Sequence, residues 1–248
     1  MRARRRTVVI DCFPESLPRY GAGYAVVAVD VIRATTTAVT AAALGRRCFP
    51  AGTLEDAVAL AERLDDALLA GELGGSLPYG FELNNSPAAL SSRRDLHRPL
   101  VLLSTSGTRT ITEAYRADEV YAACLRNYRA QALALAGHAT AVALVGAGAR
   151  GEFREEDQLC CAWIAERLLE LGFTAADAVT DGLVDRWSGK PVDAIADGKS
   201  AEYLRATDQL ADLDFVLRHV DDLGDAFVYR EGELVAAGTT RAGHAAAL

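Results

Sequence analysis

Short runs of apolar and β-branched residues alternate with helical patterns along the chain, and this alternation limits the fold more than any other feature. Six runs have the length and composition of buried strands, at residues 8–11, 25–30, 48–51, 99–104, 119–122 and 139–145. Helical patterns lie between or after them, at residues 34–44, 54–64, 86–90, 108–115, 128–136 and 155–171. This order predicts an α/β fold in which helices cover a mostly parallel sheet.

The pattern weakens after Gly172, which is placed to end the long helix. Two shorter helical patterns follow, at residues 201–207 and 210–220. The stretch "AFVYREGELVAA" then predicts two antiparallel strands that turn at Glu231–Gly232. We place a boundary between two α/β halves at residue 137, giving residues 1–137 and 138–248; one compact unit is the alternative.

Charge and cysteine content restrict the class of protein. The net charge is −8, and the positive residues are scattered arginines apart from Lys190 and Lys199, so a nucleic-acid binder with a basic stripe is excluded. The chain contains no apolar run of 18 residues, so the sequence predicts no membrane span. The five cysteines have no CxxC spacing, which argues against a disulfide framework or a zinc site. We therefore expect a cytoplasmic enzyme; a homodimer is compatible with the sequence.

The first polar segment that follows a predicted strand is "DVIRATTT". Asp30 ends the strand, and Arg33, Thr35 and Thr36 begin a helix whose free N–H groups favour an anion. Arg33 adds a planar fork for phosphate or sulfonate oxygens. Asp30 would repel that anion, so a divalent metal between them is the natural third party. The alternative is structural, with Asp30 as helix cap and the threonines as filler.

Two further segments carry donors and acids. The glycine-rich loop at residues 71–90 holds Glu72, a candidate metal ligand or base, and Asn85–Ser86, which cap a helix that begins with proline. The stretch "STSGTRT" joins a strand to a helix and forms a second anion cradle from Ser106, Gly107, Thr108 and Arg109. Because ligands bind at the carboxyl ends of parallel strands, we expect these segments to converge. Two cradles indicate a substrate with two anionic groups.

The fourth segment, "GAGARGEFREED", contains a GxGxxG spacing after a strand. Acids open the following helix where a dinucleotide pyrophosphate would lie, so a dinucleotide site is excluded. Acids beside an arginine favour a metal-plus-anion site instead. The residues concerned are Arg150, Glu155, Glu156 and Asp157.

These four segments, with "GELGG" and "GFELNNSP" in the loop, occur in the order seen in the 2-phosphosulfolactate phosphatase family, which the chain resembles over roughly residues 8–220. The resemblance implies a three-layer α/β/α fold of two similar halves. It also implies Mg²⁺-dependent hydrolysis of a small anionic phosphoester. The family reaction converts 2-phospho-3-sulfolactate to 3-sulfolactate, a step toward coenzyme M.

Roles follow from this resemblance together with the residue chemistry. We expect Asp30 and Asp157 to bind Mg²⁺, with Glu72 and Glu156 as further metal ligands. Arg33 and Arg109 would hold the phosphoryl oxygens and offset charge in the transition state. The attacking group is either water or Asp30 itself; water is preferred because position 32 is Ile, not a second Asp. The expected substrate-binding residues are Thr35, Thr36, Asn85, Ser86, Ser106, Gly107, Thr108 and Arg150.

The loop departs from the family pattern. Leu73 and Leu77 stand where the family pattern has basic residues, Glu82 replaces Asp, and Asn84 replaces Gly. Each lost charge-assisted contact costs on the order of 1.5–3 kcal/mol. Two alternatives therefore stay open: a phosphatase for another 2-phospho acid without the sulfonate, and a non-catalytic anion-binding protein.

Overall fold

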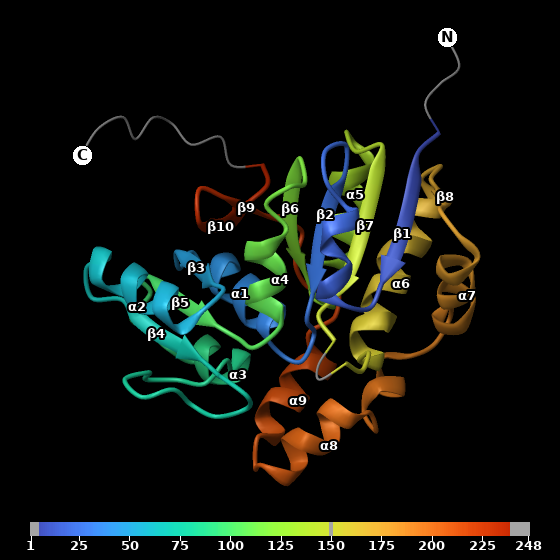
Figure 1. Ribbon diagram of the computed structural model, residues 1–248. Coiled ribbons are helices and arrows are strands. Elements are labelled where there is room, and N and C mark those ends of the chain that lie inside the picture. The colour runs from blue at the N-terminus through green and yellow to red at the C-terminus, as the bar shows by residue number, and fades with distance from the viewer. Residues whose placement is uncertain (1–4, 149–150, 239–248) are drawn as a thin grey trace.

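The strands of the protein form one mixed sheet. The computed structural model describes residues 5–148 and 151–238, and in these residues the sheet has ten strands (Figure 1). They are β1 (Thr7–Asp11), β2 (Ala25–Val29), β3 (Cys48–Ala51), β4 (Leu68–Gly71), β5 (Leu100–Leu103), β6 (Glu119–Ala123), β7 (Ala141–Gly146), β8 (Thr174–Ala175), β9 (Phe227–Arg230) and β10 (Glu233–Ala236). Their order across the sheet is β4-β5-β3-β10-β9-β6-β2-β7-β1-β8.

Two parallel groups of strands meet at a hairpin. Strands β4, β5 and β3 form one group, and β6, β2, β7, β1 and β8 form the other. The hairpin of β9 and β10 lies between them, antiparallel to β6 on one side and joined to β3 by the single pair Leu234–Cys48 on the other. Glu231 and Gly232 turn the hairpin with φ of 51° and 85°, which confirms the predicted turn.

Helices cover both faces of the sheet, which confirms the α/β/α layering. In the described residues they are α1 (Ala34–Ala43), α2 (Leu54–Arg63), α3 (Pro87–Ser91), α4 (Gly107–Glu113), α5 (Tyr128–Ala136), α6 (Glu155–Glu170), α7 (Ala178–Trp187), α8 (Lys199–Ala206) and α9 (Leu210–Arg218), with 3₁₀ turns at Pro14–Arg19 and Val192–Ile195. Alternate residues of β2 enter different cores. Val27 and Val29 pack with α5, α6 and α7, whereas Val26 and Ala28 pack with α1 and α4. Burial on both faces explains why β2 is continuously apolar.

The six strands predicted from the sequence are present with ends within two residues of those expected. Strands β4 and β8 and helix α7 were not predicted. Strands from before and after residue 137 interleave in the one sheet, since β1 lies between β7 and β8. This arrangement favours the alternative of one compact unit, and the division into two halves stays a prediction.

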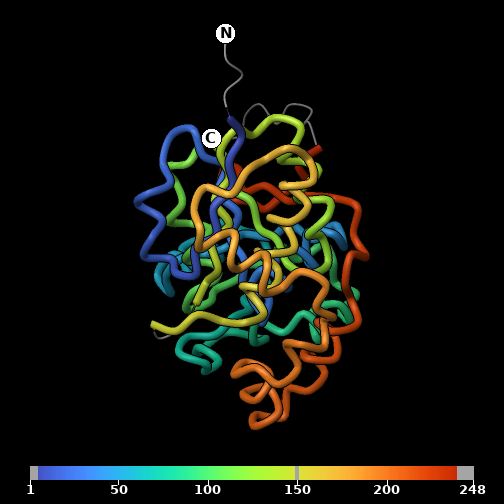
Figure 2. Tube along the Cα trace, turned by 90° about the vertical axis from the view of Figure 1, so that its right-hand side faces the viewer, coloured from blue at the N-terminus to red at the C-terminus, as the bar shows by residue number. Residues whose placement is uncertain are grey.

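Helices α8 and α9 project as a lobe beyond the rest of the fold (Figure 2). In Figure 1 this lobe lies below the carboxyl ends of β2 and β7, while β4 and β5 approach the same region from the other group. The lobe therefore lies at the edge where the sequence analysis placed the ligand. No helix in the described part of the chain has the length and apolar character needed to cross a membrane.

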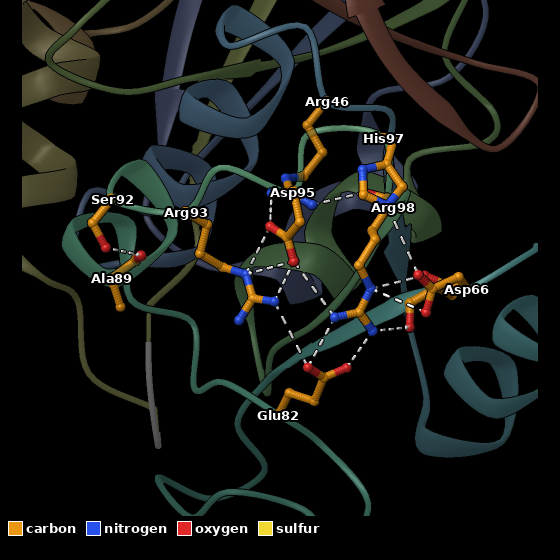
Figure 3. A network of polar contacts seen from close by, with 10 residues as sticks. Arg46, Asp66, Glu82, Ala89, Ser92, Arg93, Asp95, His97 and Arg98 are labelled. Carbon is orange, nitrogen blue, oxygen red and sulfur yellow. Dashed lines mark hydrogen bonds and ion pairs between the residues drawn. The ribbon is translucent and has the colours of Figure 1, made fainter.

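A buried arginine anchors the loop before β5. The Arg46 side chain is fully buried; Nη2 contacts Asp95 Oδ1 at 2.8 Å and Nη1 donates to the Arg98 carbonyl at 2.7 Å (Figure 3). Asp95 also accepts from Arg93. Hydrogen bonds from Arg93 and Arg46 hold the pKa of Asp95 well below its usual range. The ion pair therefore links the end of α1 to the loop that leads into β5.

We expect Asp95→Asn to lower the free energy of unfolding at pH 7 by about 1–3 kcal/mol, because Arg46 then lacks its counter-charge. A lowered carboxyl pKa contributes stability above the unfolded pKa of about 3.9, and this stability is lost as pH falls through the folded pKa. The difference from the unmutated protein should thus shrink below about pH 4. Urea denaturation of both proteins at pH 7 and below pH 4 measures this difference. Asp66→Asn, whose side chain is 61% exposed, is the control and should change stability by less than about 0.5 kcal/mol.

Candidate active site

One cavity of about 420 Å³ collects residues from all four predicted segments. This confirms that the segments converge at the carboxyl ends of the strands. The volume suits a small metabolite rather than a dinucleotide or a polymer. Its lining includes Asp30, Arg33, Glu72, Asn85, Thr105, Ser106, Glu152, Arg154, Asp157, Lys199 and Tyr203.

Two aspartates from different elements lie at the carboxyl end of β2. Asp30 directly follows β2, and its Oδ1 accepts the Ala34 N–H at 3.1 Å. Asp157 lies in the first turn of α6, and its Oδ1 accepts the Val31 N–H at 2.8 Å. Gly107 is required beside them, because a Cβ there would lie 2.2 Å from Asp30 Oδ2. The glycine lets the start of α4 approach the Asp30 carboxylate.

The buried carboxyl groups of Asp30, Glu156 and Asp157 disfavour one another's ionisation. Burial raises the pKa of Asp30 to about 7, and the charges of Glu72 and Glu156 add to the rise. Burial, then the charges of Asp30 and Glu156, raise the pKa of Asp157. Burial also raises the pKa of Glu156, whose Oε1 has no hydrogen-bond partner in the described residues. A cation among these acids would offset the repulsion.

The donor chemistry fits Mg²⁺. In residues 5–148 and 151–238, no group of three or more His, Cys, Asp or Glu side chains is placed to enclose a metal. Mg²⁺ commonly binds only one or two protein carboxylates and completes its octahedron with water and phosphate oxygens. Asp30 and Asp157 would supply that number of hard oxygen ligands on the cavity wall.

Arg33 lines the cavity, and residues at the start of α9 bind its guanidinium group. Its side chain is buried, and Nη1 donates to Asp212 and to the Gln209 side-chain oxygen. Asp212 is itself buried and also accepts from the Ser86 hydroxyl and the Ala88 N–H. Asp212 thus neutralises Arg33 and fixes its position. The sequence analysis missed it because it is 179 residues away along the chain.

The glycine-rich loop and the loop after β5 are tied together by Glu72. Its Oε1 accepts the Thr105 N–H at 2.7 Å, and its Oε2 accepts from Gly75 N–H and the Thr105 hydroxyl. Glu72 therefore shapes this wall of the cavity in addition to contributing its charge. Asn85 and Ser106 also line the cavity, and the Asn85 side-chain oxygen is buried without a partner in the described structure. Such an oxygen is available to a ligand.

Several predicted substrate-binding residues support the site from outside the cavity. Thr35 and Thr36 are buried, and their hydroxyls donate to the carbonyls of residues 30 and 31. Thr108 is buried against Ser104, and Ser86 caps α3 and bonds to Asp212. The Thr35 and Thr36 hydroxyls hold the segment that carries Asp30 and Arg33, and the Ser86 hydroxyl holds Asp212, the partner of Arg33. The Thr35 and Thr36 hydroxyls thus have partners within the chain, as the structural alternative expects, and their role in substrate binding stays a prediction.

Arg109 lies beside the main cavity. Its side chain is 55% exposed, pairs with Glu113 at 2.6 Å, and lines an adjoining hollow of about 70 Å³ that shares Thr105 and Ser106. Leu73 and Leu77 are exposed and are absent from the cavity lining. Arg150 lies outside the described residues.

Helix α8 supplies cavity residues that no sequence motif indicated. Lys199, Ser200, Tyr203 and Leu204 line the cavity from this helix, and the Tyr203 hydroxyl donates to the Gly75 carbonyl at 3.0 Å. The sequence showed here only an ordinary helical pattern. Its position over the loop at residues 72–76 depends on the path of the whole chain.

Comparisons with known proteins identify the family of the chain. The sequence profile described as 2-phosphosulpholactate phosphatase matches residues 12–223. A Synechococcus protein named probable 2-phosphosulfolactate phosphatase is 36% identical over 174 residues, covering 68% of this chain and 72% of the relative. A Deinococcus radiodurans protein of the same name is 36% identical over 192 residues, covering 75% and 80%. The chain therefore belongs to the 2-phosphosulfolactate phosphatase family and is a phosphoric monoester hydrolase.

Proposed function

We propose that this protein hydrolyses 2-phospho-3-sulfolactate to 3-sulfolactate and inorganic phosphate with Mg²⁺. The observation that carries the proposal is the convergence of Asp30, Asp157 and Arg33 on one metabolite-sized cavity. Family membership and the names of the relatives support the choice of substrate. The proposed reaction breaks a phosphoric monoester with water.

The side chains divide into two roles in this proposal. Asp30 and Asp157 hold Mg²⁺, which when bound neutralises phosphoryl oxygens. Arg33 donates to the phosphoryl group from a position fixed by Asp212. Asn85 and Ser106 orient the ester from the same wall of the cavity. Preorganised donors of this kind stabilise charge that develops in the transition state.

A second candidate is hydrolysis of a 2-phospho acid without the sulfonate. The observation in its favour is the apolar pair Leu73 and Leu77, which removes two basic residues from the loop beside the cavity. The two candidates share the phosphoryl chemistry and differ in the second anion of the substrate. A direct comparison of two substrates separates them.

The test is phosphate release from 2-phosphosulfolactate and from 2-phospholactate, with Mg²⁺ and with EDTA. We expect kcat/KM to be at least about tenfold higher for the sulfonate ester, equivalent to about 1.4 kcal/mol, and EDTA to abolish both activities. Equal cleavage of both esters would favour the second candidate. Release that persists in EDTA contradicts the role of Mg²⁺, and cleavage of neither ester contradicts the proposal.

A further inference from the structure

A compact group of three charged side chains lines the cavity. Glu152 and Arg154 come from the segment before α6, and Lys199 begins α8. Lys199 Nζ lies 2.7 Å from Glu152 Oε2, and Arg154 Nη1 lies 3.4 Å from the same oxygen. One carboxylate thus holds two cations at the cavity wall, and the group carries a net charge of +1.

The other cavity arginine, Arg33, is assigned to the phosphoryl group in the proposed function. Arg33 is buried and bonded to Asp212 and Gln209, so its charge is already balanced within the protein. Arg109 pairs with Glu113 beside the cavity. Among the described cavity residues, Arg154 and Lys199 are therefore the two cations that share one carboxylate, Glu152, and the charge of Arg154 also acts on the buried Glu156.

We propose that Arg154 and Lys199 form a second anion site, which binds the sulfonate group of the substrate. This inference rests on the proposed function and deepens it, because it assigns the end of the substrate that is not hydrolysed. The planar guanidinium of Arg154 and the ammonium of Lys199 can donate together to the three oxygens of a sulfonate. They supply positive charge that Leu73 and Leu77 do not.

Glu152 has a defined part in this arrangement. In the free protein it holds both cations at the wall, so they are positioned before the substrate arrives. Its side chain is 53% exposed, so it can turn toward solvent when the sulfonate replaces it. The site discriminates by charge, since 2-phospholactate carries no group to place there.

The first test compares Arg154→Gln, Lys199→Gln and the double variant on both phosphate esters. We expect each single change to lower kcat/KM for 2-phosphosulfolactate about tenfold, as for a lost charge-assisted hydrogen bond, and to leave 2-phospholactate within about twofold. Arg205→Gln is the matched control on α8, because Arg205 pairs with Asp197 and does not line the cavity. Lys199 is 66% exposed, so its replacement alone gives a readable result if the other variants fold poorly.

The second test needs no turnover and measures binding of 3-sulfolactate and of lactate by calorimetry. We expect 3-sulfolactate to bind more tightly, and the difference to disappear in the double variant. If both esters are cleaved but the variants leave their ratio unchanged, the second anion site is wrong while the proposed function stands. If neither ester is cleaved, the proposed function fails. In that case, tighter 3-sulfolactate binding that depends on Arg154 and Lys199 still supports the site, and equal binding overturns it.

Discussion

Asp30→Asn is expected to lower phosphatase kcat by at least about 10³-fold and, at the same time, to stabilise the metal-free protein above neutral pH. The loss of activity is expected because Asp30 supplies one of two carboxylates proposed to hold Mg²⁺, and such a contribution is worth several kcal/mol. The gain in stability is expected because burial and nearby acids make the ionised form of Asp30 unfavourable in the folded protein. Asn keeps the Oδ1 that accepts the Ala34 N–H, so the fold should be retained.

The pH dependence of this gain has a definite sign. Burial raises the pKa of Asp30 from 3.8 to about 7. A carboxyl with a raised folded pKa contributes stability below pH 3.8 and loses it as pH rises through about 7. Asn does not ionise, so the variant keeps the free energy of unfolding that the unmutated protein loses as Asp30 ionises. The stability difference should grow between pH 4 and pH 8 to at most about 4 kcal/mol.

Urea denaturation in EDTA at pH 5 and pH 8 measures this difference. Asp197→Asn is the control, since its side chain is 98% exposed and it should behave alike at both pH values. Added Mg²⁺ should raise the melting temperature of the unmutated protein at pH 8 and leave Asp30→Asn nearly unchanged. A variant that is less stable than the unmutated protein at pH 8 would contradict the electrostatic cost assigned to Asp30.

Asp212→Asn is expected to impair both stability and catalysis, although Asp212 does not line the cavity. The change removes the negative charge that faces the buried Arg33, and an uncompensated buried charge costs about 3–5 kcal/mol. Arg33 would then shift to find another partner. A displaced positioning group commonly costs about 100-fold in rate, so kcat/KM should fall by that amount.

The experiment joins urea denaturation with kinetics on 2-phosphosulfolactate. Asp214→Asn is the matched control on the same helix, because its pair with Arg218 is exposed and should matter by less than about 0.5 kcal/mol. Asp212→Glu restores the charge and should recover part of kcat/KM, which a purely structural role in packing would not predict. Unchanged kcat/KM in Asp212→Asn would show that Arg33 needs no such support.

Local patterns predicted the elements whose residues carry a clear signal. Strands such as β2 are apolar on both faces and rich in β-branched residues, so their type and ends could be predicted. Strand β4 reads only "LLAG", and β8 has two residues at the edge of the sheet, so neither shows a period or a β-branched run. Helix α7 contains Gly182, which weakens its helical pattern.

The sequence predicted those site residues whose place depends on where a strand ends. It did not predict the residues whose role depends on the direction in which the side chain points. Asp30, Glu72 and Asp157 were expected at one edge of the sheet because each follows or faces a strand end. Thr35 and Thr36 have the chemistry of anion ligands, yet their hydroxyls bond to nearby carbonyls. Asp212 and Lys199 enter through contacts between distant segments, which a single sequence does not specify.

The place of the β9–β10 hairpin also bears on how the protein is made. Ribosomes release the N-terminal residues first, so both parallel groups of strands emerge before residues 227–236. In the part of the chain that the structure describes, the hairpin is the strand connection between the group that leads to Glu72 and the group that leads to Asp30, while α1 and α4 pack against strands of both groups. We therefore expect α1 and α4 to hold the two parallel groups together until the hairpin, which is synthesised after both groups, completes the sheet.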